Sequence, residues 1–455
     1  MSVEITRLLE RARELAATAR DEAAKAAYLE LLHLDPRHFA ALSELGSLAL
    51  ASGHRSAAQT AYLQAVRCHP DNPVGHVNLG TLSLQYGEPA AARDQYQAAL
   101  RIDPDYAEAH QGLARALCEL GEHAAAQPHF VEGFTGRSIV LQRYRGIAPP
   151  IQVLLLVSVQ LGNILVRAIL DDRVFQVAAL YTEFHDEQLP LPPHTVVFNA
   201  IGDADLCAAA LEQAQGVLKR TRAPVINSPL QVQRTGRIDN ARRLGGIPGV
   251  IAPATRLVAR ATLMAEQSLG LPLLLRAPGF HMGQHFLRIE RSEELDEVAT
   301  LPGEELLAIE YLDARGADGM SRKYRVLFID GVLYPLHLAV SSHWKVHYFS
   351  ADMATSQQFR DEERRFLEDM GGALGPRTLA ALTQIAAALG LDYAGIDFGI
   401  DPCGSLLLFE ANATMAILTP AADPIWDYRR APIARALAAA TEMVRKRART
   451  DPDCG

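Results

Sequence analysis

The chain has 455 residues, of which 49% are hydrophobic and 21% charged, and its formal net charge is −9. This length predicts two or three domains, and the composition is that of an ordinary soluble globular protein. The negative charge argues against a nucleic-acid partner and against an anionic membrane. Five scattered cysteines follow neither a metal spacing nor a disulfide framework. Together with an N-terminus that lacks an apolar signal segment, they predict a reducing, cytoplasmic location.

The first third of the chain repeats with a period of 34 residues. Aromatic residues, alanines and prolines each keep this step: Tyr28, Tyr62, Tyr96 and Phe130; Ala24, Ala58, Ala92 and Ala126; Pro36, Pro70 and Pro104. Small residues let two helices approach, the aromatic ring fills the space between neighbouring units, and proline ends the second helix. Residues 1–136 are therefore expected to form about four helix–turn–helix units, an all-α solenoid whose pattern resembles the tetratricopeptide repeat.

Such an array presents a concave groove, and the resemblance implies a peptide or protein segment as its partner. Asn78 suits the sub-type that clamps a C-terminal carboxylate, but other equivalent positions carry Ser43 and Glu108, so that specificity is not carried over. The alternatives are homodimerisation and packing of the groove onto the chain's own second half. The first and fourth units depart from the pattern as capping units do, which predicts that residues 1–135 fold by themselves.

Residues 137–150 are expected to be a linker, and residues 151–230 an α/β domain. "IQVLLLVS" is typical of a buried parallel strand, because polar residues interrupt the apolar run too early for a membrane span. A loop at Gly162-Asn163, a helix and two further strands, "FQVAALYTEF" and "HTVVFNAIGDAD", are expected to follow. Polar residues at the strand ends are where open sheets bind ligands, although loop chemistry explains them equally well.

Two later segments place cations beside glycine-containing or helical backbone. Residues 223–258 combine a strand, an Asn-Ser-Pro turn and a helix that carries Arg237. In "LPLLLRAPGFHMGQHFLRIE", a strand ends at Arg276, and the loop after it contains Gly279 and Gly283. Backbone amides in such a loop can surround phosphate oxygens. His281 and His285 in this loop either contact an acceptor substrate or are exposed to solvent.

Two more strands are predicted before the C-terminal region. "LLAIEYLD", residues 306–313, contains the acidic Glu310. In the next strand Arg325 lies among apolar residues, where an arginine seldom lacks an anionic partner. His337 and Lys345 are two candidates for a later basic residue that faces a substrate.

The most informative stretch is "YAGIDFGIDPCGSLLLFEANATM", residues 393–415. Alternating apolar residues and the Asp-Pro-Cys-Gly turn predict a β-hairpin. A four-residue turn would place Asp397 opposite Leu408, with Glu410 as its diagonal neighbour about 7–8 Å away. Asp397, Glu410 and Asn412 offer hard oxygen ligands, which suit Mg²⁺ shared with nucleotide phosphates. The alternative is a surface hairpin that carries two acids by chance.

An Asp on one strand followed by "FEAN" on the next resembles the metal-binding end of the ATP-grasp ligases, in the branch of ribosomal-protein glutamate ligases, glutathione synthetases and D-alanine–D-alanine ligases. The similarity runs from about residue 150 to 440 and implies a multidomain chain: the repeats, the α/β pre-ATP-grasp domain of residues 151–230, and an α+β ATP-grasp domain over residues 231–455.

The resemblance also implies the site. ATP would be bound by Arg237, Arg276, Gly279, Gly283, Glu310, Tyr311 and Leu312, Mg²⁺ by Asp397, Glu410 and Asn412, and the catalytic cations would be Arg325 and Arg276. Arginine replaces the family's usual lysine at Arg237 and Arg276, which alters the phosphate geometry. The family's Ser-Pro-Gly after the asparagine is replaced by "ATMAILTP".

The implied activity is an ATP-dependent ligase that joins a carboxylate to an amine or thiol through an acylphosphate. Its small-molecule substrate would be an amine or a carboxylate, and the repeats would recruit a peptide or protein. A nucleotide-binding pseudoenzyme whose repeats act as a scaffold is the alternative from a different class, and a phosphotransferase on the same fold is a third.

Overall fold

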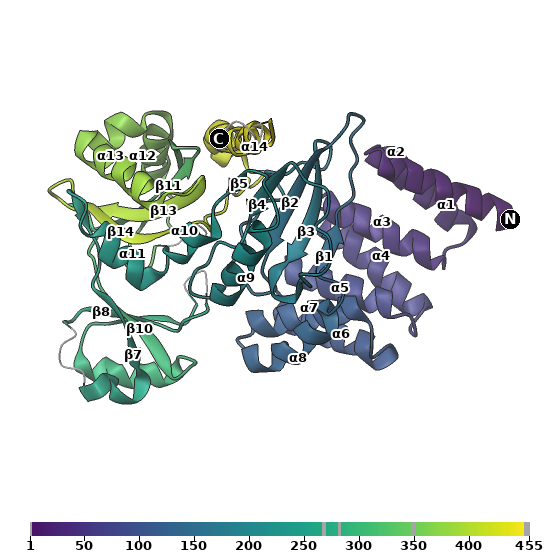
Figure 1. The fold of residues 1–455 in the computed structure, drawn as a ribbon, viewed down its shortest axis with the longest axis horizontal. Helices are drawn as coiled ribbons and strands as arrows, with labels where there is room; N and C mark the ends of the chain where they lie inside the picture. Colours follow the sequence, from purple (N-terminus) through teal and green to yellow (C-terminus); the bar gives the residue numbers. More distant parts are fainter. Residues whose placement is uncertain (1, 266–269, 281–283, 347–350, 450–455) are drawn as a thin grey trace. The chain divides into compact units, whose positions relative to one another are not determined.

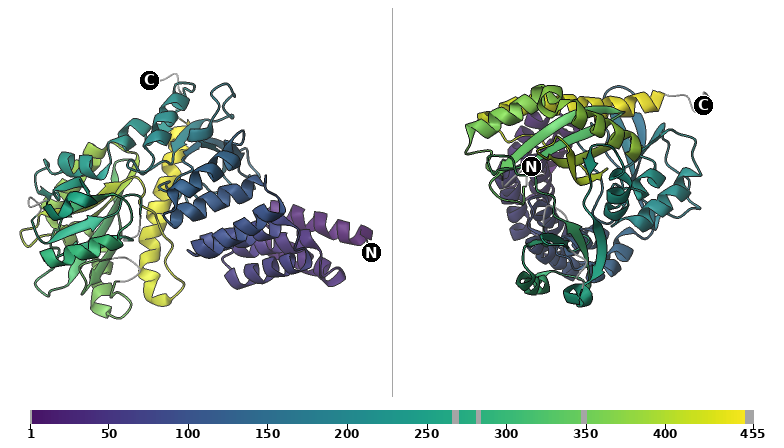
Figure 2. Two further views of the ribbon diagram at one scale, coloured as in Figure 1. Left: turned by 90° about the horizontal axis from the view of Figure 1, so that it is seen from below. Right: turned by 90° about the vertical axis from the view of Figure 1, so that its left-hand side faces the viewer.

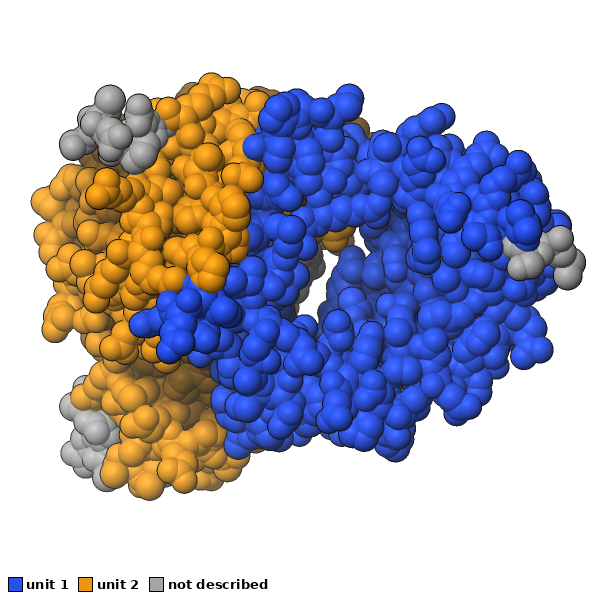
Figure 3. Space-filling model, turned by 45° about the vertical axis from the view of Figure 1, so that its right-hand side comes forward, with its two compact units in different colours: residues 1–150, 159–161, 172–189 blue, residues 151–158, 162–171, 190–455 orange. Residues whose placement is uncertain are grey.

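The structure, a computed structural model, describes residues 2–265, 270–280, 284–346 and 351–449. It divides into two compact units (Figure 3). Unit 1 comprises residues 1–150, 159–161 and 172–189, and unit 2 comprises residues 151–158, 162–171 and 190–455. None of the helices in these described ranges is long and apolar enough to cross a membrane.

Unit 1 begins with eight helices in four successive pairs (Figures 1 and 2). They are α1 (Ser2–Ala17), α2 (Asp21–Leu34), α3 (Phe39–Ala51), α4 (Arg55–Cys68), α5 (Pro73–Gln85), α6 (Pro89–Ile102), α7 (Ala107–Glu119) and α8 (His123–Phe134). The 34-residue period therefore predicted the helix–turn–helix units correctly.

Glycine and tyrosine explain why the helices of a pair lie so close. A Cβ atom at Gly46 would lie 2.5 Å from the ring of Tyr62, and one at Gly80 would lie 2.9 Å from the ring of Tyr96. Both tyrosine rings are almost completely buried. The Leu-Gly pair of the repeat is thus the place where the aromatic ring of the second helix packs on the first.

The last repeat is closed by the chain that follows it. The Phe134 ring lies 4.4 Å from that of Tyr181 and 5.9 Å from that of Phe184. These two residues lie on β3 (Phe175–Tyr181), which pairs with β1 (Ile139–Leu141), and on the short helix η1 (Thr182–Phe184). Phe134 of the last repeat thus packs on partners from beyond residue 170, and the folding of residues 1–135 by themselves stays a prediction.

Apolar residues of the last two repeats also pack with later residues of unit 1. Val77 and Leu84 of α5, together with Leu117 of α7, belong to one apolar cluster with Val159 and Leu161. The first helices of such repeats line the concave face. Within unit 1, the last two repeats therefore share an apolar cluster with later residues of the chain, and the three alternatives for the groove stay predictions.

Unit 2 contains three parallel strands, β2 (Ile151–Val157), β4 (Val196–Asn199) and β5 (Val225–Ile226), with α9 (Ala208–Leu218) between the last two. The helix expected after Asn163 is absent. Ile164 instead bonds the backbone of Ala200 at 2.7 Å, and Ile169 and Leu170 form only a single turn on Val166. Ile164, Ile169 and Leu170 are buried without a helix, whereas Leu165 is exposed.

A second sheet has the antiparallel order β7-β10-β8-β9, with an apolar core on one side. Its strands are β7 (Thr255–Ala259), β8 (Leu273–Arg276), β9 (Phe286–Ile289) and β10 (Glu305–Glu310), accompanied by η2 (Arg260–Ala265) and η3 (Ser292–Thr300). Helices α10 (Pro229–Gln233) and α11 (Arg237–Leu244) precede this sheet in the chain.

The third sheet has the order β12-β11-β13-β14-β6. Its strands are β6 (Val250–Ile251), β11 (Ser321–Ile329), β12 (Val332–Ser341), β13 (Tyr393–Ile400) and β14 (Leu406–Asn412), and the remaining helices are α12 (Gln357–Glu368), α13 (Met370–Leu389), η4 (Pro424–Arg429) and α14 (Arg430–Arg449). Helices α12 and α13 pack on β12 and β13, and α11 contacts β14 (Figure 1).

The predicted hairpin is present, but its predicted register is wrong. Asp397 pairs with Glu410, whereas the next residue, Phe398, pairs with Leu408. The reversal takes five residues, since Asp401 N donates to Ser405 O at 3.0 Å, and a β-bulge then leaves Phe409 without a partner in the ladder. Both shifts bring the two carboxylates directly opposite each other, closer than the diagonal placement expected.

Candidate functional site

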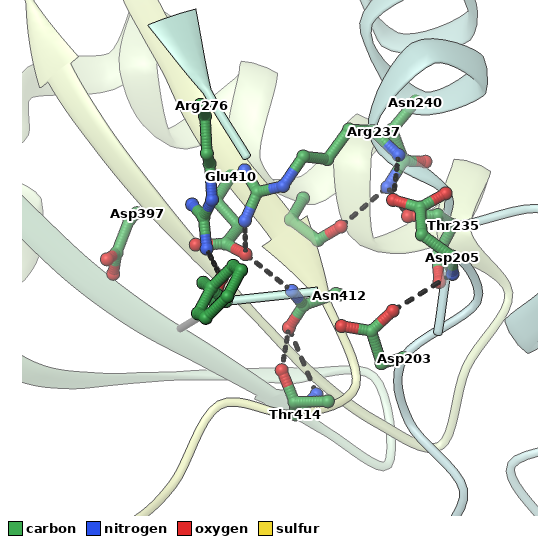
Figure 4. A network of polar contacts seen from close by, with 12 residues as sticks. Asp203, Asp205, Thr235, Arg237, Asn240, Arg276, Asp397, Glu410, Asn412 and Thr414 are labelled. Atoms are coloured by element: carbon green, nitrogen blue, oxygen red, sulfur yellow. Dashed lines mark hydrogen bonds and ion pairs between the residues drawn. The ribbon is translucent and has the colours of Figure 1, made fainter. Parts of the chain in front are cut away.

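A cleft of about 550 Å³, partly open to solvent, lies in unit 2 between the second and third sheets. Strand β14 and helix α11 form one wall, and Thr255 of β7 and Ile309 of β10 form the other. Asp203 and Asp205, from the loop after β4, also line the cleft. Figure 4 shows the polar side chains of this region.

Asp397 is held by two cations of β11. Arg325 Nε and Nη2 donate to the two carboxylate oxygens at 2.6 and 2.7 Å, and Lys323 Nζ lies 3.2 Å from Oδ2. Burial alone would raise the pKa of Asp397, but the two cations hold that pKa far below its usual range. Asp397 is therefore ionised, although only 3% of it is exposed.

Glu410 meets cations from two other elements. Arg237 at the start of α11 donates Nη2 to Glu410 Oε1, and Arg276 at the end of β8 points toward the same carboxylate (Figure 4). Burial opposes ionisation, but the charges of Arg237 and Arg276 lower the pKa of Glu410. The two carboxylates are thus ionised neighbours that depend on different cations.

Arg276 lies among charges of both signs. Burial, and next the charge of Arg237, lower its pKa to about 10, although Glu410 and Asp203 act in the opposite direction. Its Nη2 donates to the backbone oxygen of Phe280. Asp203 and Asp205 line the same cleft, so the acidic and basic side chains of this region are equal in number: Asp203, Asp205, Asp397 and Glu410 with Arg237, Arg276, Lys323 and Arg325.

Asn412 is fixed on both sides of its amide. Its Nδ2 donates to Glu410 Oε1 at 3.0 Å. Its Oδ1 accepts from the backbone N–H of Thr414 at 3.0 Å and from the Thr414 hydroxyl at 2.9 Å. The three predicted metal residues are consequently adjacent, and Asn412, whose oxygen accepts two hydrogen bonds from Thr414, orients Glu410.

The predicted nucleotide residues of β10 have other contacts. Glu310 Oε2 accepts from the backbone N–H of Ala254 at 3.0 Å, and the Tyr311 ring lies 4.1 Å from the Arg288 guanidinium. Ile309, their neighbour, lines the cleft. Gly279 has a φ of +87°, a left-handed conformation that suits glycine. Gly283 and His281 lie outside the described residues.

His337 and Lys345, the two candidates for a basic residue that faces a substrate, differ in charge. Only 5% of His337 is exposed, and its burial, followed by the charge of Arg325, lowers its pKa well below the usual value, so it is neutral at pH 7. Lys345 is exposed, and burial and the charge of Arg276 lower its pKa. Of the two, Lys345 is the cation.

Comparisons with known proteins concern the helical repeats. Family profiles described as tetratricopeptide repeats match residues 43–107 and 95–127. Unit 1 therefore contains tetratricopeptide repeats. No curated protein matches the chain significantly. Repeats of this family suggest protein–protein interaction. The sheets of unit 2 form a mixed α/β region.

Several solved structures resemble a little more than a quarter of the chain. A MamA protein is 21% identical over 28% of this chain and 70% of its own, with a TM-score of 0.27. MamA from Desulfovibrio magneticus is 22% identical over 28% and 73%, with a TM-score of 0.26. A tetratricopeptide repeat protein from Parabacteroides merdae is 20% identical over 28% and 52%, with a TM-score of 0.27.

The donor set fits a hard cation only together with an anion. Within the described ranges, no group of three or more His, Cys, Asp and Glu side chains is placed to hold a metal by itself. Asp397, Glu410 and Asn412 provide oxygen atoms of the kind Mg²⁺ prefers. Because Asp397 and Glu410 are already paired with cations of the chain, Mg²⁺ accompanied by phosphate oxygens suits the site better than Mg²⁺ alone.

Sequence reasoning missed Lys323, Thr414 and Asp205. Lys323 lies two residues before Arg325 on one strand, so the period of two already placed both on one face. Asp205 Oδ2 accepts from the backbone N–H of Arg237 at 3.1 Å, and burial raises its pKa. That contact joins residues 32 positions apart, and no local pattern indicates it.

Proposed function

We propose that unit 2 binds Mg·ATP in the cleft and acts as an ATP-dependent ligase that joins a carboxylate to an amine or thiol. The observation that carries the proposal is the pair of ionised carboxylates, Asp397 and Glu410, which lie opposite each other and are each paired with cations from other elements. Tetratricopeptide repeats in the same chain support a peptide or protein as substrate or partner.

In this proposal the three arginines of the site have definite tasks. Arg276 and Arg237 bind phosphate oxygens, and Arg325 faces the phosphoryl group that is transferred to the substrate carboxylate. Mg²⁺, bound with the nucleotide, offsets negative charge on the phosphates. Fixed guanidinium groups in a cleft lose little by reorganisation when charge moves during the transfer, and such preorganisation lowers the barrier.

Calorimetric titration with ATP, with and without Mg²⁺, tests the nucleotide site. The parent chain is expected to bind ATP more tightly with Mg²⁺, and Glu410→Gln is expected to lose that difference. If Glu410→Gln binds Mg·ATP as tightly as the parent, the metal assignment is wrong. A mass-spectrometric screen with pooled amino acids and peptides then tests for a mass gain in the substrate together with release of ADP.

A nucleotide-binding scaffold is the second candidate. One observation favours it: Asp397 is already engaged on both oxygens by Arg325 and Lys323, so a metal must compete with two cations. A scaffold would bind Mg·ATP and a protein partner yet release no ADP with any substrate pool. The screen described above separates the two functions.

A further inference from the structure

Thr414 contacts the predicted metal residues through two donors. Its backbone N–H and its hydroxyl both bond Asn412 Oδ1, at 3.0 and 2.9 Å. A backbone N–H can only donate, so the atom of Asn412 that faces it must be the amide oxygen. The direction of the Asn412 amide is therefore determined by Thr414.

The direction of the Asn412 amide determines which of its two polar groups faces Glu410. With its oxygen held by Thr414, Asn412 turns its NH₂ group toward Glu410 Oε1, at 3.0 Å (Figure 4). If the amide were reversed, NH₂ would face the Thr414 N–H, and the amide oxygen would face a carboxylate. Both contacts would be repulsive, so one hydrogen-bonded chain runs from Thr414 through Asn412 to Glu410.

We propose that Thr414 is a positioning residue of the nucleotide–metal site, and that its hydroxyl fixes Asn412 and, through it, the Glu410 carboxylate. The inference rests on the proposed function. It assigns Thr414 a place in the Mg²⁺-dependent part of ATP binding, without contact between Thr414 and the nucleotide.

The methyl group of Thr414 has a different, structural contact. A Cβ atom at Gly202 would lie 2.8 Å from Thr414 Cγ2, so the methyl group packs on the backbone of the loop after β4. The hydroxyl and the methyl group can therefore be removed separately. Thr414→Val keeps the packing and removes the hydroxyl, whereas Thr414→Ser keeps the hydroxyl and removes the methyl group.

The test is a calorimetric titration of the full chain with ATP at several Mg²⁺ concentrations, with the thermal midpoint measured for each variant. Thr414→Val is expected to weaken Mg²⁺-dependent ATP binding roughly 2- to 10-fold, the effect of one neutral hydrogen bond, and to leave Mg²⁺-free binding unchanged. Thr414→Ser is expected to bind as the parent does. Thr383→Val is the matched control, because that exposed threonine bonds only the backbone of its own helix.

The outcomes separate the two proposals. If the parent shows no Mg²⁺-dependent ATP binding, both the proposed function and the role of Thr414 fail. If Glu410→Gln loses the Mg²⁺ effect but Thr414→Val keeps it, only the role of Thr414 is overturned. If Thr414→Ser is the weaker variant, the methyl packing matters and the hydroxyl does not, which also overturns it.

Discussion

Arg276 is the single residue whose surroundings most clearly call for an anion. It is half-buried, its pKa is lowered to about 10, and one of the charges that lower this pKa is another arginine, Arg237. A phosphate group would relieve this repulsion. Arg276→Met is therefore expected to lose about 1.5–3 kcal/mol of ATP binding, roughly ten- to a hundredfold in affinity, and Arg276→Lys to keep part of it. Calorimetry measures both.

Arg291→Met is a suitable control for Arg276. The Arg291 side chain is 76% exposed and pairs only with Glu294 in a surface turn, within the described residues. Its removal is expected to leave ATP affinity unchanged. An Arg276→Met chain that is folded and titrates like the parent would contradict the phosphate role.

The lowered pKa of Asp397 predicts that the stability of the folded chain depends on pH. Its pKa is lowered in the folded chain, so its contribution to stability is complete above the unfolded value near 3.8 and is lost as the pH falls below it. Urea midpoints measured between pH 2.5 and pH 5 are expected to rise with pH in the parent. Asp397→Asn is expected to be less stable throughout, because Arg325 loses its partner, and to show a shallower rise.

At most, one such group contributes about 1.4 kcal/mol per pH unit to the slope. Other surface carboxylates add their own share in both chains, so the comparison of slopes is the decisive quantity. Parallel curves for the parent and for Asp397→Asn would show that Arg325 and Lys323 do not hold this carboxylate ionised.

The hairpin of β13 and β14 shows how the elements place these residues. A Cβ atom at Gly399 would lie 2.6 Å from the Ala314 side chain and 2.9 Å from the ring of Phe409, the bulged residue. Gly399→Ala is therefore expected to destabilise the chain by about 1–3 kcal/mol, as overpacking does, and to disturb the bulge that places Glu410 opposite Asp397. Thermal unfolding measures the first effect and Mg·ATP titration the second.

Gly246→Ala is the control for Gly399→Ala. The nearest atom to a Cβ there is the Arg243 oxygen at 3.8 Å, which is ordinary contact. The Gly246→Ala variant is expected to have the same thermal midpoint as the parent. If Gly399→Ala is equally harmless, the bulge does not depend on this close approach.

The same hairpin shows what the sequence could and could not predict. Alternation and turn residues predicted both strands, and residue type identified the three adjacent polar side chains. The predicted register was wrong because the reversal takes five residues and a bulge adds another at Phe409, where Gly399 approaches Ala314, a residue 85 positions away. The prediction of a helix after Asn163 was wrong for a related reason: the backbone of Ile164 bonds that of Ala200, a residue 36 positions away, and no local pattern indicates this contact.

At the scale of the whole molecule, unit 1 limits how the repeats can be removed. A chain lacking residues 1–136 would expose Val159, Leu161 and Tyr181, which pack on the last repeats. It is expected to aggregate or to unfold at a lower temperature than the full chain. A chain lacking only residues 1–70 keeps that cluster, and it is expected to remain soluble. Light scattering and thermal midpoints compare the two.

This comparison also decides how peptide delivery is tested. Loss of kcat/KM after complete removal of the repeats would mix lost recruitment with lost folding, whereas the shorter deletion tests recruitment by the first repeats alone. A soluble, monomeric chain without residues 1–136, with the parent's thermal midpoint, would contradict the structural role of the last repeat.

Because the Phe134 ring packs against Tyr181 and Phe184, a repeat cannot be added equally well at every position of the array. A 34-residue unit inserted before α5 meets surfaces of its own kind on both sides. A unit inserted after α8 would have to match β3 and η1 as well, which no other repeat does. Gene duplication can thus lengthen this solenoid from within, while the boundary with β1 stays constant, and sequence drift at Phe134 is tied to drift at two positions nearly fifty residues later.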